Sequence, residues 1–220
     1  MIFVDIIGAI VEAMRTTGTI TAVVTAGDIS TCQSANHGLV AGDIIVIAGS
    51  SYTIISAGTN DFTVEGAPGR GEIWVNESPY YLYGHPLEIF NILKEKSKSE
   101  TFKYSKYPLV ALYQDYEENI NNTVTTIKGV TIVIMTETSR TYTAPNRFTN
   151  TFTPILHPLY ELLIAHIKRS KYLNSADYQH TKIDRMYWGK EDTFGNSGNI
   201  GNDALDAIVI KIDLEIIKKC

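Results

Sequence analysis

Hydrophobic residues change their spacing twice along the chain, and these changes divide it into three parts. In "MIFVDIIGAIVEAMR" the apolar residues recur at helical spacing and the acidic residues fall elsewhere on the wheel, which predicts an amphipathic helix over 2–16. From residue 18 to residue 76, short runs of Val, Ile and Thr alternate with turn residues, which predicts five or six short strands. A helical period returns at residue 86.

The remainder of the chain is predicted to mix helices with strands. "HPLEIFNILKEKSKSE" predicts a helix over 86–98, and "PILHPLYELLIAHIKRSKY" predicts a third helix that starts near Pro158. The segments "YPLVALYQDYEE", "TTIKGVTIVIMTETS" and "HTKIDRMYWGK" are typical of strands. The clearest strand is the last one, in which aliphatic residues occupy every second position: Ile208, Ile210, Ile212, Leu214 and Ile216.

This order of elements predicts an α+β fold made of two domains. Residues 1–17 and 78–220 are expected to form a mixed or antiparallel sheet flanked by helices. Residues 18–77 are expected to form an inserted all-β domain, a small SH3-like or OB-like barrel, because closure removes the exposed strand edges that promote aggregation.

A family resemblance is carried by "HGLVAGDIIVIAG", followed by "SYTIIS" and "NDFTVEG", within residues 36–66. This pattern resembles small barrels of tailed-bacteriophage virion proteins, although no Asn-Gly pair precedes the aromatic residue of "SYTIIS". The surrounding order of helices and strands is similar to the phage tail-terminator and head-to-tail connector (neck ring) family.

The resemblance implies a structural virion protein assembled in the host cytoplasm, with no enzymatic activity. Its expected partners are further copies of itself in a cyclic homo-oligomer and the neighbouring portal, connector and tail proteins, with DNA passing through without specific binding. An alternative is a non-enzymatic binding module, such as a tail adhesin whose barrel recognises a peptide or glycan. An enzyme is the third and least favoured class.

Composition and charge agree with such a role. The chain has 220 residues, of which 44% are hydrophobic and 20% charged, as in ordinary globular proteins. Residues 17–77 contain six acidic residues and only Arg70, so their net charge is 1 − 6 = −5, which equals that of the whole chain. An acidic domain argues against tight binding of nucleic acid, because such binding depends on neutralised phosphates, and it suits a conduit that DNA passes.

Candidate chemistry is sparse. The five histidines are scattered and no metalloprotease, CxxC, nucleophile-elbow or P-loop motif is present, so we predict no catalytic, cofactor-binding or metal-binding residues. His37 lies in the turn "NHG", where stabilising the turn is favoured over chemistry. Cys32 and Cys220 are expected to be unpaired thiols. The apolar N-terminal segment is too short and too interrupted by charge to span a membrane, so no membrane partner is expected.

The candidate functional residues are therefore interface residues. Residues 137–153, "ETSRTYTAPNRFTNTFT", have no period of their own and are predicted to form an arm that orders on a neighbouring subunit. The alternative is a flap folded back over its own sheet. Aromatic residues at junctions are a second set of candidates. Together the predicted interface residues are Arg140, Tyr142, Arg147, Phe148, Phe152, Tyr80, Tyr81, Tyr187 and Trp188.

Overall fold

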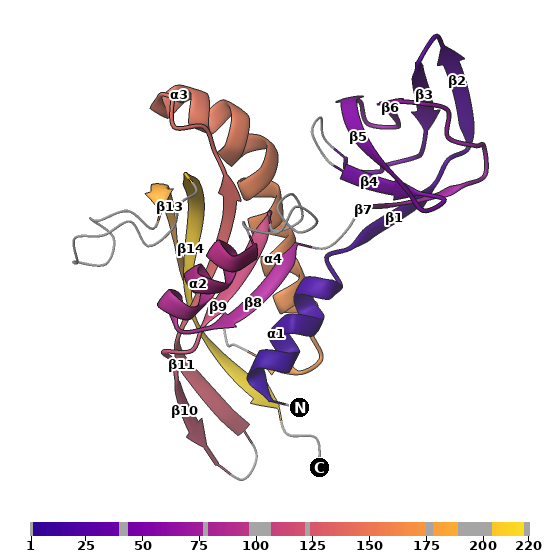
Figure 1. The fold of residues 1–220 in the computed structure, drawn as a ribbon. Helices are drawn as coiled ribbons and strands as arrows, with labels where there is room; N and C mark the ends of the chain where they lie inside the picture. Colours follow the sequence, from indigo (N-terminus) through magenta and orange to yellow (C-terminus); the bar gives the residue numbers. More distant parts are fainter. Residues whose placement is uncertain are drawn as a thin grey trace. The chain divides into compact units, whose positions relative to one another are not determined.

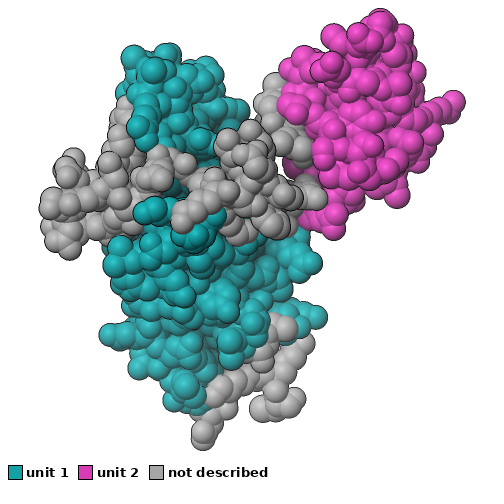
Figure 2. Space-filling view, in the orientation of Figure 1, with its two compact units in different colours: residues 1–12, 79–220 teal, residues 13–78 magenta. Residues whose placement is uncertain are grey.

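The chain folds into two compact units. The computed structural model describes residues 2–39, 44–76, 79–96, 107–121, 124–174, 178–188 and 204–217. Unit 1 comprises residues 1–12 and 79–220, and unit 2 comprises residues 13–78, where the sequence predicted an insert over 18–77 (Figure 2). The fold is α+β, as predicted. Among the described residues, the helices are too short or too polar to cross a bilayer.

A mixed sheet forms the centre of unit 1. Its strands follow the order β12-β14-β11-β9-β8, with β10 paired to β11 and β13 paired to β14. Among the described strand pairs of this sheet, only β8 and β9 run parallel to each other, and the others are antiparallel. The strands are β8 (Tyr80–Gly84), β9 (Leu109–Tyr113), β10 (Glu117–Ile120), β11 (Val124–Glu137), β12 (Leu173–Asn174), β13 (His180–Trp188) and β14 (Leu205–Ile217).

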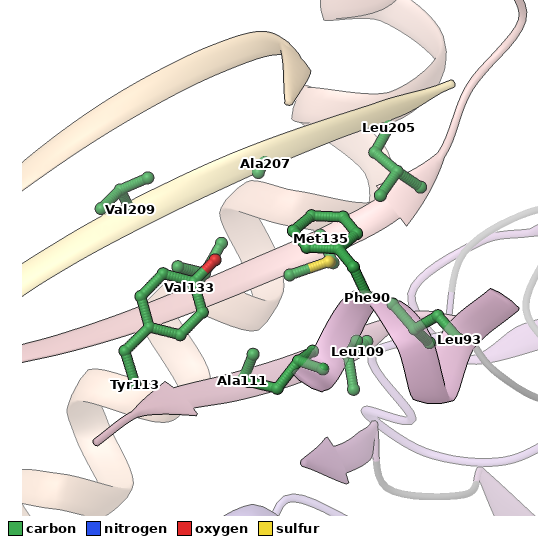
Figure 3. Packing of buried hydrophobic residues seen from close by; sticks show 11 residues of the cluster. Phe90, Leu93, Leu109, Ala111, Tyr113, Val133, Met135, Leu205, Ala207 and Val209 are labelled. Atoms are coloured by element: carbon green, nitrogen blue, oxygen red, sulfur yellow. The ribbon is translucent and has the colours of Figure 1, made fainter. Parts of the chain in front are cut away.

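Helices cover both faces of this sheet (Figure 1). On one face, α2 (Pro86–Lys96) packs Ile89, Phe90 and Leu93 onto the sheet, and Figure 3 shows Phe90 beside Met135 of β11. The sheet side of this core consists of alternate strand residues, as the period of two requires: Leu109, Ala111, Tyr113, Val133, Met135, Leu205, Ala207 and Val209.

The opposite face is covered by α1 (Phe3–Glu12) and by one continuous helical run made of α3 (Ala144–Arg147), the π-helical segment η1 (Phe148–Leu156) and α4 (His157–Arg169). The segment η1 packs against β11 and β14, and α1 packs against α4, β8 and β9. Both faces of the central strands are thus buried. For that reason β11 reads as an unbroken apolar run from Ile132 to Met135, all four residues being fully buried.

The described residues of unit 2 form seven strands in the hydrogen-bonded order β1-β7-β4-β5-β6-β3-β2. Their bounds are β1 (Thr16–Thr19), β2 (Ala22–Ala26), β3 (Ile29–Gln33), β4 (Ile44–Ile47), β5 (Ser50–Ala57), β6 (Asp61–Glu65) and β7 (Ile73–Asn76). All described pairs are antiparallel. The core of the unit is apolar and includes Ile20, Cys32, Ile45, Ile47, Ile54, Phe62, Val64 and Trp74.

The hairpin turn between β4 and β5 forms without an Asn-Gly pair. Ala48 and Gly49 form a two-residue hairpin loop with φ of 49° and 85°. Positive φ at both central residues is the signature of a type I′ turn, which matches the twist of the flanking strands. Gly49 adopts this conformation without steric cost, whereas Ala48 carries a Cβ in the left-handed region.

Candidate interaction surfaces

Most of the segment predicted as an arm is helical, so the expectation that it has no period of its own is wrong. Residues 144–156 form α3 and η1 and continue directly into α4. The missed signal was the spacing of four between Phe148, Phe152 and Leu156, which is helical. Pro154 and several threonines lie among these residues and made the segment read as irregular, and Pro154 indeed falls inside the π-helical segment.

A buried ion pair fastens this helical segment to the sheet. The Arg147 Nη1 atom lies 2.6 Å from Oδ1 of Asp206 on β14, and both side chains are at most 1% exposed. Arg147 also donates from Nη2 to the Ser139 carbonyl at 2.9 Å, and from Nε to the Tyr142 carbonyl at 3.3 Å. The second carboxylate oxygen of Asp206 accepts a hydrogen bond from the Thr151 hydroxyl at 2.8 Å. The network thus compensates both buried charges with ionic partners and hydrogen bonds.

This burial decides which predicted interface residues reach the surface. Arg147 and Phe152 are fully buried inside their own chain, so the prediction that they form an exposed docking arm is corrected. Phe148 is 41% exposed and stacks on Phe152 with a centroid separation of 4.9 Å. Arg140 is exposed and Tyr142 is half-buried. The flap folded over its own sheet, which was the alternative, describes this segment better.

The tyrosines after the insert have mainly internal partners. The half-buried Tyr81 donates its hydroxyl to the Val4 carbonyl at 3.0 Å, and its ring lies against Gly8 of α1. A Cβ added to Gly8 would lie 3.1 Å from this ring, so glycine permits the close approach. Burial, reinforced by the neighbouring Tyr116, raises the pKa of Tyr81. Tyr80 packs against the core beneath α2.

Two further candidates lie on the edge strand β13. The register places Trp188 opposite Leu205 of β14, after an irregularity between Arg185 and Trp188. The side chains of Tyr187 and Trp188 lie outside the described residues.

A polar cluster that no sequence motif indicated lies between α4 and β13. The Tyr160 hydroxyl lies 2.7 Å from Nε2 of His180, whose Nδ1 lies 2.8 Å from the Tyr178 carbonyl. Asp184 accepts from Lys182 at 2.7 Å and lies 3.3 Å from Nε2 of His157. Tyr160 and His180 are 20 positions apart and His157 and Asp184 are 27 positions apart, so the cluster forms only when α4 and β13 come together. The arrangement gives the surface of unit 1 a mixed, largely compensated charge at this place.

In unit 2, His37 has the turn-stabilising role that the sequence favoured. Its Nε2 atom lies 3.0 Å from the Asp61 carbonyl, and its Nδ1 accepts the Leu39 amide proton at 3.0 Å. The imidazole is 6% exposed and packs edge-on against Phe62. Both ring nitrogens are thus used in holding the turn.

A shallow polar hollow lies beside this turn. It has a volume of about 370 Å³ and is lined by Thr21, Gln33, Ser34, Ala35, Asn60 and Asp61. Several of these groups already have internal partners, since Ser34 accepts from the Trp74 indole at 2.9 Å and Asn60 accepts from the Asn36 amide at 3.0 Å. The hollow offers amide, hydroxyl and carboxylate groups but no aromatic ring.

Among the described residues, no group of three or more His, Cys, Asp and Glu side chains is arranged to hold a metal ion. The comparisons with known proteins add no functional residue. No protein-family model matches the chain, and no curated protein shows significant sequence similarity to it.

Proposed function

We propose that this chain is a structural subunit of a tailed-phage virion, a ring-forming component of the head-to-tail connector or tail-completion complex. The observation that carries the proposal is the insertion of a compact all-β unit between α1 and β8 of an α+β unit. The resemblance to the tail-terminator and neck-ring family rests on the order of helices and strands around this insert.

We further propose that unit 2 is a small barrel of the SH3-like or OB-like kind. Strands β1 and β2 stand at opposite ends of its strand order, yet only Ile20 and Thr21 separate them in sequence. The Ile20 amide donates to the Glu72 carbonyl at 2.9 Å, while the Thr21 amide donates to the Gln33 carbonyl at 2.8 Å. One continuous stretch therefore bonds to both ends of the sheet, which favours closure.

Charge also supports a role beside passing DNA. Among the described residues of unit 2, four exposed or half-exposed acidic side chains, Asp28, Asp61, Glu65 and Glu72, stand against Arg15 and Arg70. Such a unit repels phosphate at short range, so a subunit of this kind can line or flank a channel without holding the nucleic acid.

The proposal is tested by the assembly state of the purified protein. Mass photometry and negative-stain microscopy should show cyclic oligomers or addition to purified portal-bearing capsids. A protein that remains monomeric at all concentrations and does not add to such particles contradicts the proposal.

The alternative of a binding module is favoured by one observation, the polar hollow lined by Gln33, Asn60 and Asp61. Amide and carboxylate side chains are groups that can bind sugar hydroxyls. A glycan array with the wild type and with Gln33→Ala tests this alternative, because Gln33 is exposed and its truncation should leave unit 2 folded. Binding that is lost in Gln33→Ala supports it, and the absence of binding by the wild type contradicts it.

A further inference from the structure

At one end of unit 1 the sheet narrows to four strands, in the order β10, β11, β14 and β12. Ile120 on β10 lies opposite Thr125, Thr125 lies opposite Ile216, and Ile216 lies opposite Leu173 on β12. β10 and β12 are therefore the two outermost strands of this part of the sheet. Within the described residues, β10 pairs only with β11 and β12 only with β14, so both are edge strands.

The β10 edge is acidic. Asp115, Glu117 and Glu118 are all exposed, and residues 115–121 contain no lysine or arginine. Glu117 lies opposite Lys128 in the register, but within the described part of the chain neither forms an ion pair. We name Asp115, Glu117 and Glu118 the acidic edge; it presents three carboxylates to solvent (β10 is labelled in Figure 1).

The opposite end of the row is basic. Lys168 and Arg169 lie in the last turn of α4, and Lys171 follows just before β12, against which α4 packs. All three are exposed, and residues 166–172 contain no acidic residue. Lys171 lies 5.1 Å from the ring centroid of Tyr172. We name Lys168, Arg169 and Lys171 the basic corner.

The charges discriminate between the possible contacts of two copies. An isologous contact between two acidic edges would bring six carboxylates together, and a contact between two basic corners would bring six cations together, so both are repulsive. A head-to-tail contact instead places three carboxylates against three cations.

We propose that the acidic edge of one copy binds the basic corner of a second copy in a heterologous, head-to-tail contact. The inference rests on the proposed ring function and supplies the contact that such a ring needs, since head-to-tail interfaces generate closed rings when the rotation closes. Side chains make the contact. The outward Leu173 carbonyl of β12 already accepts a hydrogen bond from the Tyr178 hydroxyl at 3.5 Å.

Charge reversal tests the contact in the full-length protein. Variant A carries Glu117→Lys and Glu118→Lys, and variant B carries Lys168→Glu and Arg169→Glu. Each should self-associate at least about tenfold more weakly than the wild type, because like charges then face each other. An equimolar mixture of A and B should recover assembly, since each variant then finds an oppositely charged surface on the other. The matched control, Asp28→Lys with Glu65→Lys in unit 2, reverses two exposed acidic residues and should assemble like the wild type.

Cross-linking tests the direction of the contact. Asn119 on β10 and Asn174 on β12 are exposed and lie at the two ends of one row, through Thr126 and Glu215. In a Cys220→Ser background, mixed Asn119→Cys and Asn174→Cys proteins should form the mixed disulfide in preference to either symmetric dimer. Cys32 is buried and should not interfere.

The outcomes separate this inference from the proposed function. If the wild type forms rings and variants A and B form them equally well, the edge contact is overturned and the ring proposal stands. A preference for the symmetric 119–119 cross-link has the same consequence. A wild type that does not associate, together with Asn119→Cys and Asn174→Cys proteins that do not cross-link, overturns both. Loss of assembly in A and B with recovery in their mixture supports the contact.

Discussion

Arg147 at the end of α3 and Asp206 on β14 form an ion pair 2.6 Å apart although they are 59 positions apart in the sequence, and both side chains are buried. Both side chains are shielded from water, so the charge of each is stabilised by the other and by the surrounding hydrogen bonds. The pair ties the position of α3 and η1 to the start of β14.

Removing one partner of this pair should destabilise unit 1 strongly. Asp206→Ala leaves Arg147 charged, buried and without its carboxylate, which is expected to cost about 3–5 kcal/mol in urea unfolding. The double variant Arg147→Met, Asp206→Leu should lose much less, since it leaves no buried charge. Glu137→Ala, at an exposed position of β11, serves as the control and should change stability by about 0.5 kcal/mol or less. An Asp206→Ala protein as stable as this control would show that the pair contributes nothing.

Substitution to aspartate should cost much more stability at Ile212 of β14 than at the neighbouring Lys211. Ile212 is 3% exposed, whereas its neighbour Lys211 is exposed. Ile212→Asp buries an unpaired carboxylate and should cost about 3 kcal/mol or more, measured by thermal or urea unfolding. Lys211→Asp should be mild. Equal losses in the two variants would contradict the face assignment.

The sequence predicted a helix or strand correctly where its hydrophobic residues kept one spacing without interruption. The alternation from Ile208 to Leu214 predicted β14 and its buried face, and the α+β class followed from the order of such elements. The helical segment 144–156 was missed because Pro154 and β-branched threonines obscured its spacing of four. No local pattern could reveal that Asp206 is the partner of Arg147. A pairing across 59 residues exists only once the sheet and the helices have packed.

The turn at Ala48 should accept a stabilising substitution. Ala48 is exposed and has φ of 49°, where its Cβ is strained, and Gly49 follows it. Ala48→Asn creates the Asn-Gly pair that type I′ turns prefer and should raise the stability of unit 2 by roughly 0.5–1 kcal/mol. Ala48→Val, which is β-branched, should lower it. The midpoint of urea unfolding checks both, and a loss of stability in Ala48→Asn would argue against this turn geometry.

The thiol of Cys32 should make unit 2 sensitive to alkaline pH. Burial, with a smaller contribution from Glu72, raises the pKa of Cys32 from 9.0 to about 11. The unfolded chain therefore loses this proton first, so the stability contribution is complete below about pH 8.5 and is lost as pH rises towards about 11. Between these limits Cys32→Ala should show a shallower fall in stability than the wild type. In a Cys220→Ser background, Ellman's reagent at pH 8 should react slowly with the native protein and fast in denaturant; equally fast reaction in both would contradict the burial.

Unit 1 should fold without unit 2. Gly8 of α1 touches Tyr81 of β8, so Glu12 lies about 6 Å further along the helix and Pro79 about 7 Å back along the extended chain. A Gly/Ser linker of about 12 residues, with an average span of roughly 19 Å, can therefore replace residues 13–78. Its closure cost differs little from that of the natural connection, because each doubling of loop length adds only about 0.6 kcal/mol. The shortened protein should melt cooperatively and keep the Tyr81 contact, so Tyr81→Phe should destabilise it by about 1 kcal/mol, as in the full chain. A non-cooperative melt would show that unit 2 contributes to the core of unit 1.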